Sequence, residues 1–334
     1  MVLFFAIGAL LFWLAVKDQN IHLIREKLAR ADWVWAVPAL ALSCISNIVR
    51  AARWNLLIHP LGDRPRLVNT FGAVVVGYMA NLALPRAGEV SRCVVLNRYE
   101  KTPIDKLFGT VVTERAIDVL TVVLLLGVVV LLESDKMGAF SVRYVLRPLE
   151  ARVNVGVAQR VSWFAIIAAV CVAAFGLYGA LSVSDRDSGP ASRLRTIMSG
   201  FTSGIRTIGQ LHNEQGFVLY TILLWALYVV AAYACFQSFR ATSGLGLIAA
   251  LAVVVFGGLG WAAPVQGGIG TVDIMITQTL VMFGTPVNDG LAYAILWHAT
   301  QVIGMVVFGV CAVVLLPIIN RRPPVRKPNP MGSV

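Results

Sequence analysis

Long runs of apolar residues, separated by short polar connections, constrain the fold of this chain more than any other feature. Several of these runs approach or exceed the roughly 20 residues that a helix needs to cross a bilayer. Only 13% of the 334 residues are charged, about half the share in a typical soluble domain. We therefore predict an all-α polytopic membrane protein, with full spans at residues 2–16, 33–58, 107–132, 161–181, 217–239 and 290–319.

Two further apolar runs are interrupted by proline and glycine. Residues 67–84 end at Pro85, close to Gly88, and residues 245–263 end at Pro264, followed by Gly267 and Gly268. The apolar pattern then resumes for short pieces at 90–96 and 271–283. Because these pieces are short, we predict two re-entrant hairpins beside about six full spans. If the broken segments cross completely, the number of spans rises to eight or more.

The order of elements is the same in both halves of the chain. An amphipathic segment, a span, a broken apolar run and a long span follow each other twice, at an offset of about 180 positions. Such paired breaks are typical of inverted-repeat transporters with a site at the breaks. We predict a single membrane domain over residues 1–320, with repeats at about 1–135 and 160–320, and a basic, proline-rich tail at 321–334.

The net charge of +11 has a plain interpretation in a membrane protein. With six spans and two hairpins, both termini face the cytoplasm, and that side carries more lysine and arginine than the other, as the positive-inside rule requires. We expect location in the cell (inner) membrane and contact with anionic headgroups. No aromatic-and-basic motif for nucleic acid accompanies the charge.

Three charged residues lie inside the span that follows the first break. Glu114, Arg115 and Asp118 stand in the run TERAIDVLTVVLLL, where a charge on a lipid-facing surface is costly. We expect them to face protein or a water-filled cavity, with Arg115 paired to a carboxylate. They form either part of a transport site or an ion network that only ties the hairpin to the span.

More polar residues surround the first break, in NLALPRAGEVSR. A re-entrant turn exposes backbone polar groups, which a membrane tolerates only where they are buried in protein or line a cavity. Asn81 is placed to satisfy some of them, and Arg86 and Arg92 suit an anionic group such as a lipid phosphate. Glu89 and Arg92, three positions apart, are alternatively a simple ion pair.

Outside this cluster the polar candidates are fewer. Arg50 and Arg53 close the second span, where we favour side chains that extend to the headgroups. In the second half, Gln266, Asp273 and His298 are polar residues in apolar surroundings. A single histidine in a span is more often a structural hydrogen-bond donor than a proton relay.

Four sequence features resemble one known family, the lysylphosphatidylglycerol synthase transmembrane region or flippase-like domain. They are RAARW at 50–54, N-x-x-x-P-x-x-G-E-x-x-R at 81–92, T-E-R-x-x-D at 113–118 and P-x-x-G-G-I-G at 264–270. The resemblance implies a lipid translocase. It also leads us to expect an arginine near His298, which this chain lacks. No aminoacyl-transferase domain follows the last span, so we expect no synthase activity.

The sequence thus favours a flippase or scramblase for a headgroup-bearing, anionic lipid. The alternatives are a lipid-binding accessory subunit without transport and, less favoured, an intramembrane enzyme acting on lipid. We expect no catalytic residues, cofactor or metal, since none of the common motifs for them is present. A homo-oligomer or a lipid-synthesising partner remains compatible with the sequence.

Overall fold

The computed structural model describes Trp13, Lys136 and residues 21–84, 87–134, 213–263 and 265–321. Within these residues every regular element is helical. The predicted spans at 2–16 (apart from Trp13) and 161–181, residues 192–212 of the amphipathic segment in the second half, residues 322–334 of the tail, and Pro85, Arg86 and Pro264 lie outside the described residues. Expectations about them, including the match between complete repeats, stay predictions.

Four described helices are long and apolar enough to cross a membrane, and they fall where the sequence predicts them. They are α3 (Ala36–Ile58, extended by the 3-10 turns η1, Trp33–Trp35, and η2, His59–Leu61), α6 (Ile104–Leu132), α11 (Glu214–Phe236) and α14 (Val287–Ile319). The short α2 (Ile21–Ala29) precedes α3. The described part of the chain is therefore that of a polytopic helical membrane protein.

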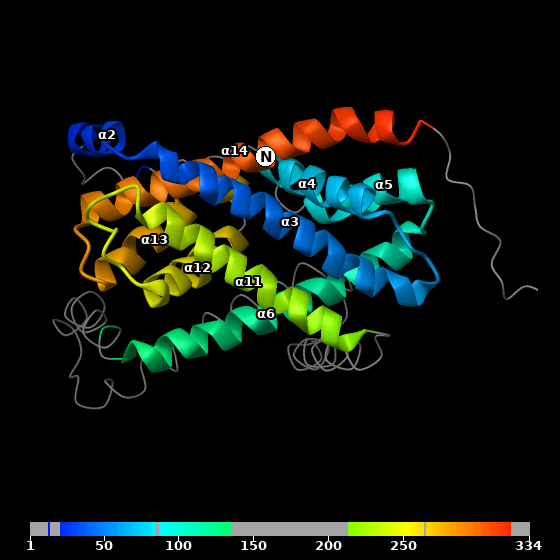
Figure 1. The fold of residues 1–334 in the computed structure, drawn as a ribbon, viewed down its shortest axis with the longest axis horizontal. Helices are drawn as coiled ribbons and strands as arrows, with labels where there is room; N and C mark the ends of the chain where they lie inside the picture. Colours follow the sequence, from blue (N-terminus) through cyan, green and yellow to red (C-terminus); the bar gives the residue numbers. More distant parts are fainter. Residues whose placement is uncertain are drawn as a thin grey trace, which may run out of the picture.

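Two pairs of shorter helices fill the remainder. The first pair is α4 (Leu67–Ala83) and α5 (Ala87–Glu100), and the second is α12 (Leu247–Ala262) and α13 (Thr271–Met282), joined through the 3-10 turn η4 (Gln266–Gly268). The two helices of each pair pack against each other as a hairpin (Figure 1). At 17 residues, α4 is about 25 Å long, shorter than the roughly 30 Å hydrocarbon core.

The breaks follow from backbone chemistry. A residue before proline is disfavoured in the helical conformation, and Leu84 and Ala263, which precede Pro85 and Pro264, are both extended. At the second break Gly267 has a φ of 59° and Gly268 a φ of 68°, in the left-handed region that glycine tolerates. After the first break α5 is longer than the predicted piece at 90–96, because it continues through Asn97 to Glu100, where the chain becomes polar.

The two hairpins open toward opposite ends of the bundle (Figure 1). We call one end the Asn320 end, because Asn69 at the start of α4 bonds both Glu100 at the end of α5 and Asn320 after α14. The other is the Lys27 end, where Lys27 of α2 bonds Asp289 at the start of α14 at 2.6 Å. The α4–α5 hairpin opens at the Asn320 end, and the α12–α13 hairpin lies at the Lys27 end.

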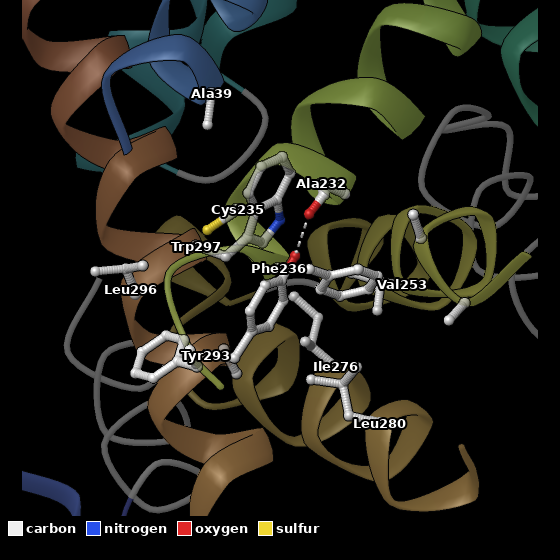
Figure 2. Close-up of a cluster of buried hydrophobic side chains, with 14 of the residues drawn as sticks. Ala39, Ala232, Cys235, Phe236, Val253, Ile276, Leu280, Tyr293, Leu296 and Trp297 are labelled. Carbon is white, nitrogen blue, oxygen red and sulfur yellow. Dashed lines mark hydrogen bonds between the residues drawn. The ribbon is translucent and has the colours of Figure 1, made fainter. Parts of the chain in front are cut away.

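Apolar packing holds each hairpin to the long helices. Around the second hairpin, Phe236, Ile276, Leu280 and Tyr293 from three helices belong to one buried cluster, in which the Tyr293 hydroxyl donates to the Ala232 carbonyl at 2.9 Å (Figure 2). Around the first hairpin a second cluster joins α3, α4, α5, α6 and α11, with the following buried members: Trp54, Ile58, Val74, Leu96, Leu107 and Phe217.

Glycines let the helices approach closely. A Cβ at Gly77 or Gly88 would collide with backbone of the other helix in the first hairpin, and one at Gly260 would lie 2.8 Å from the Cα of Val272 in the second. Between α4 and α14, a Cβ at Gly309 would lie 2.7 Å from the Cβ of Met79. Small residues at helix contacts are typical of membrane bundles.

Candidate functional site

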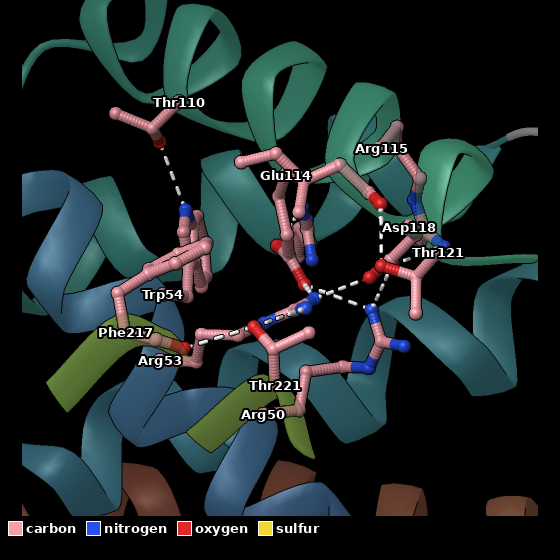
Figure 3. A network of polar contacts seen from close by, with 12 residues as sticks. Arg50, Arg53, Trp54, Thr110, Glu114, Arg115, Asp118, Thr121, Phe217 and Thr221 are labelled. Atoms are coloured by element: carbon pink, nitrogen blue, oxygen red, sulfur yellow. Dashed lines mark hydrogen bonds and ion pairs between the residues drawn. The ribbon is translucent and has the colours of Figure 1, made fainter. Parts of the chain in front are cut away.

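The charged residues predicted to be buried form one network at the tip of the first hairpin (Figure 3). Its centre is Glu114 of α6, whose side chain is fully buried. Asp118, one turn further along α6, lies on the same face, as the spacing of four predicts. Both carboxylates point toward α3.

Two arginines of α3 hold these carboxylates. Arg50 Nη1 donates to Glu114 Oε1 and to Asp118 Oδ2, both at 2.8 Å. Arg53 Nη2 donates to Asp118 Oδ1 at 2.6 Å and to Glu114 Oε1 at 3.1 Å. Our expectation that Arg50 and Arg53 extend to the headgroups is wrong: only 5% and 0% of their surfaces are exposed. Each guanidinium instead donates to both carboxylates of α6.

The α5 helix contributes the third buried arginine. Arg92 Nη2 donates to Glu114 Oε2 at 2.7 Å, and its guanidinium lies 4.5 Å from the ring centroid of Trp54. The alternative of a simple Glu89–Arg92 pair does not hold, since Arg92 is committed to Glu114. Instead Glu89 faces Arg115.

Arg115 is the least constrained arginine of the network. Its Nη2 lies 3.5 Å from Glu89 Oε1 and its Nη1 lies 3.8 Å from Asp118 Oδ2, longer than the other ion pairs of the network. Its side chain is 27% exposed, whereas that of Arg92 is 3% exposed. Arg115 therefore pairs with carboxylates as predicted, but it retains capacity for a further anion.

The network is rich in donors. Four arginines face three carboxylates, which leaves one excess positive charge. Several buried polar atoms have no hydrogen-bond partner among the described residues: the Nε atoms of Arg50, Arg53, Arg92 and Arg115, and Glu89 Oε2. Buried polar atoms are normally satisfied, so these atoms mark a place where a polar ligand or water would be favourable.

Sequence reasoning missed the helix that closes the network. The α11 residues Tyr228 and Thr221 accept from Arg50 Nη2 at 3.2 Å and from Arg53 Nη1 at 3.4 Å. Phe217 of α11 lies 5.6 Å from the Arg53 guanidinium. Tyrosine and threonine are unremarkable in a span, and no sequence signal distinguished these positions from others on α11.

At the first break Asn81 has the role the sequence predicts. Its Oδ1 accepts from the Gly88 backbone N–H at 2.7 Å, which satisfies one of the free amides at the start of α5. The position of Arg86 is outside the described residues.

A second polar group lies at the tip of the other hairpin. His298 of α14 has its Nδ1 3.1 Å from Asp273 Oδ1, and its Nε2 2.7 Å from the carbonyl oxygen of Gly267. Asp273 also accepts from the Gly270 N–H at 3.0 Å, and Trp261 packs its ring edge-on to the imidazole. Both titratable side chains are buried, at 7% and 2% exposed.

The two hairpin tips are joined. Gln266 of η4 donates from Nε2 to the Ala83 carbonyl at the end of α4, at 3.0 Å. The structure thus brings the predicted residues Glu89 and Arg92 into contact with the α6 charges, and Asp273 with His298, while Asn81 bonds the backbone of α5. Gln266 links the two breaks. No described group of three or more histidine, cysteine or acidic side chains is arranged to hold a metal.

The family model for the lysylphosphatidylglycerol synthase TM region matches residues 1–309. The chain belongs to that family. A UPF0104 membrane protein of Methanothermobacter thermautotrophicus is 24% identical over 288 residues, covering 76% of this chain and 77% of that protein.

Two further family relatives match over shorter lengths. A UPF0104 membrane protein of Pyrococcus horikoshii is 28% identical over 118 residues, 34% of each chain. The glycosyltransferase AglD of Haloferax volcanii is 28% identical over 127 residues, 36% of this chain and 20% of that protein. No solved structure matches the chain.

Proposed function

We propose that this protein is a lipid translocase that moves an anionic, headgroup-bearing lipid between leaflets. The observation that carries the proposal is the network around Glu114. It places three arginines and two carboxylates on the membrane-length helices α3 and α6, against Glu89 and Arg92 of the shorter α5 in a broken helix pair. Charges at such depth are rare in membrane proteins and typically belong to substrate or ion pathways.

The roles within the network follow from its geometry. Arg50, Arg53 and Arg92 are each held by Glu114 at 3.1 Å or less, so they fix the position of the carboxylate and of α3, α5 and α6. Arg115 is partly exposed and has only long ion pairs. We assign it to the lipid phosphate.

An anionic phosphodiester fits this charge balance. The network carries one excess positive charge, which a singly charged phosphate would neutralise. The lipid headgroup would travel past the two hairpin tips, while its acyl chains stay in the bilayer. The membrane family to which the chain belongs is consistent with a lipid substrate. The match to AglD covers one fifth of that protein, and we do not extend glycosyl transfer to this chain.

The test is movement of fluorescent lipids in proteoliposomes, with labelled phosphatidylglycerol and phosphatidylcholine compared. We expect wild type to move phosphatidylglycerol faster. Arg115→Gln should slow that movement about tenfold or more, since a hydrogen bond to a charged group contributes about 1.5–3 kcal/mol. The matched control is Arg98→Gln, an exposed arginine on α5 at the Asn320 end.

Two results would contradict the proposal. If the folded wild type moves neither lipid above empty vesicles, translocation of these lipids is excluded. If Arg115→Gln and Arg98→Gln both move phosphatidylglycerol at the wild-type rate, Arg115 does not contact the phosphate and the network is structural.

A further inference from the structure

The imidazole of His298 stands between two hydrogen-bond acceptors. One is the Asp273 carboxylate at Nδ1, at 3.1 and 3.2 Å, and the other is the Gly267 carbonyl at Nε2, at 2.7 Å. A carbonyl oxygen only accepts, so Nε2 must carry a proton. A second proton must lie between Nδ1 and the carboxylate, because otherwise a lone pair would face an anion.

This arrangement needs one proton more than a neutral histidine and an ionised aspartate possess together. Whether that proton sits on the imidazole or on the carboxylate, the pair as a whole is neutral. Loss of the proton to water leaves a net charge of −1 in a buried site. The imidazole then keeps a single N–H, and only one of its two contacts survives.

No other charged group substitutes for the proton. Asp273 is the one titratable side chain in the described chain that bonds the imidazole, while α12 presents Trp261 and η4 presents backbone. No other titratable side chain on the described helices packed against α14 bonds His298: Lys27 and Asp289 pair with each other, and Arg50 and Arg53 are held by Glu114 and Asp118. The other titratable side chains on these helices and on α14, none of them bonded to His298, are His22, Arg25, Glu26, Cys44, Tyr78, Glu214, Tyr220, Tyr228, Tyr233, Cys235, Tyr293 and Cys311.

The contacts of His298 lead directly to the hairpin tips. Gly267 belongs to η4, and the adjacent Gln266 bonds the Ala83 carbonyl of the first hairpin. We propose that Asp273 and His298 form a proton-binding site whose occupancy holds the second hairpin tip against α14 and, through Gln266, against the first hairpin. When the proton leaves, the Gly267 contact opens and the tips separate.

The proton bound by Asp273 and His298 would be the coupling ion for lipid transport, and this part of the inference rests on the proposed function. A proton gradient would set how often the site is empty on each side, and thereby bias movement of lipid past the tips. We call the proton-dependent contact between the second hairpin tip, α14 and the first hairpin the latch. The latch does not depend on the lipid, so it can be tested first without any substrate.

The first experiment is hydrogen exchange of the purified protein in nanodiscs, from about pH 5 to about pH 8, corrected for intrinsic exchange. Peptides over 265–270 and 81–84 are followed in wild type, His298→Gln and Asp273→Asn. His59→Gln, at the exposed η2 turn, is the control. We expect protection in wild type and control to fall severalfold as pH rises, and both site variants to lose this dependence.

Protection that is independent of pH in wild type overturns the latch, and this result needs no variant to fold. An equal pH dependence in His298→Gln or Asp273→Asn also overturns it, since the titrating group then lies elsewhere. If His298→Gln does not fold, the pH dependence of protection in Asp273→Asn tests the latch.

The second experiment separates the latch from transport. Proteoliposomes with labelled phosphatidylglycerol receive a pH gradient of either sign, and we expect the wild-type rate to depend on the sign and the Asp273→Asn rate not to. Lipid movement indifferent to the gradient overturns coupling while the translocase stands. A pH-dependent latch with no lipid movement supports the proton site and removes the proposed function.

Discussion

At both hairpin tips a buried carboxylate is paired with basic side chains, but the type of basic residue differs. At the first, Glu114 is surrounded by Arg50, Arg53 and Arg92, which are charged at every accessible pH. At the second, Asp273 meets His298, whose charge depends on a bound proton. One tip is therefore a permanent anchor with residual positive charge, and the other is an adjustable contact.

The largest effect should come from Glu114→Gln. The change leaves Arg92 without its carboxylate and weakens the hold on Arg50 and Arg53, and breaking a buried ion pair costs about 3–5 kcal/mol. We expect a strongly lowered Tm in detergent, measured against Asp105→Asn, an exposed carboxylate on the same helix. Equal Tm values for the two variants would mean that the network does not anchor the fold.

Asp273→Asn should cost less, about 1.5–3 kcal/mol, because one charge-assisted bond to His298 is lost. The asparagine oxygen still accepts from the Gly270 N–H. Thermal unfolding at about pH 6 measures the loss, again relative to Asp105→Asn. A loss as large as that of Glu114→Gln would remove the distinction between anchor and adjustable contact.

Glycine packing should be alike in the two hairpins. Alanine at Gly88 would meet the backbone of α4, and alanine at Gly260 would meet Val272 and Thr271 at 2.8 and 3.0 Å. We expect each to cost about 1–3 kcal/mol by overpacking. Gly109→Ala on α6, where nothing lies within 4 Å, is the control and should be neutral or slightly stabilising. A neutral Gly260→Ala would show that the second hairpin packs more loosely than the first.

The smallest effect should come from Gln266→Ala, which removes the single hydrogen bond to the Ala83 carbonyl and costs about 1 kcal/mol. Exchange protection of residues 81–84 should fall, while that of α6 does not change. Gln237→Ala, which removes a long side-chain hydrogen bond from a half-buried glutamine to the Ser243 carbonyl, serves as reference. Unchanged protection at 81–84 would indicate that the tips are not joined through this bond.

Much of the described fold was predictable from local chemistry. The apolar runs located α3, α6, α11 and α14, since a helix satisfies its backbone polar groups within one segment when it lies in lipid. Proline favours the ends of α4 and α12, because the helical conformation is disfavoured for Leu84 and Ala263, which precede it. Asn81 at the break and Asp118 beside Glu114 also followed from spacing alone.

The partners of the charged residues did not follow from the sequence. Arg50 and Arg53 lie 61 to 68 positions from the carboxylates they bind, and Tyr228 lies 178 positions from Arg50. Local pattern placed these arginines near a span end and suggested headgroup contact. Their burial results from the packing of α3 against α6, which brings residues distant in the sequence together.

The amino-acid sequence is enough to place this chain in a membrane, to locate its long helices, and to show which of them carry charge. The length of an apolar run and the steric effect of proline are local properties, so they can be read directly from the amino-acid sequence. Tertiary structure alone decided that Arg92 binds Glu114 rather than Glu89, and that His298 lies between Asp273 and Gly267. Which basic side chain reaches a buried carboxylate depends on which helix faces are in contact, and that is decided by tertiary packing.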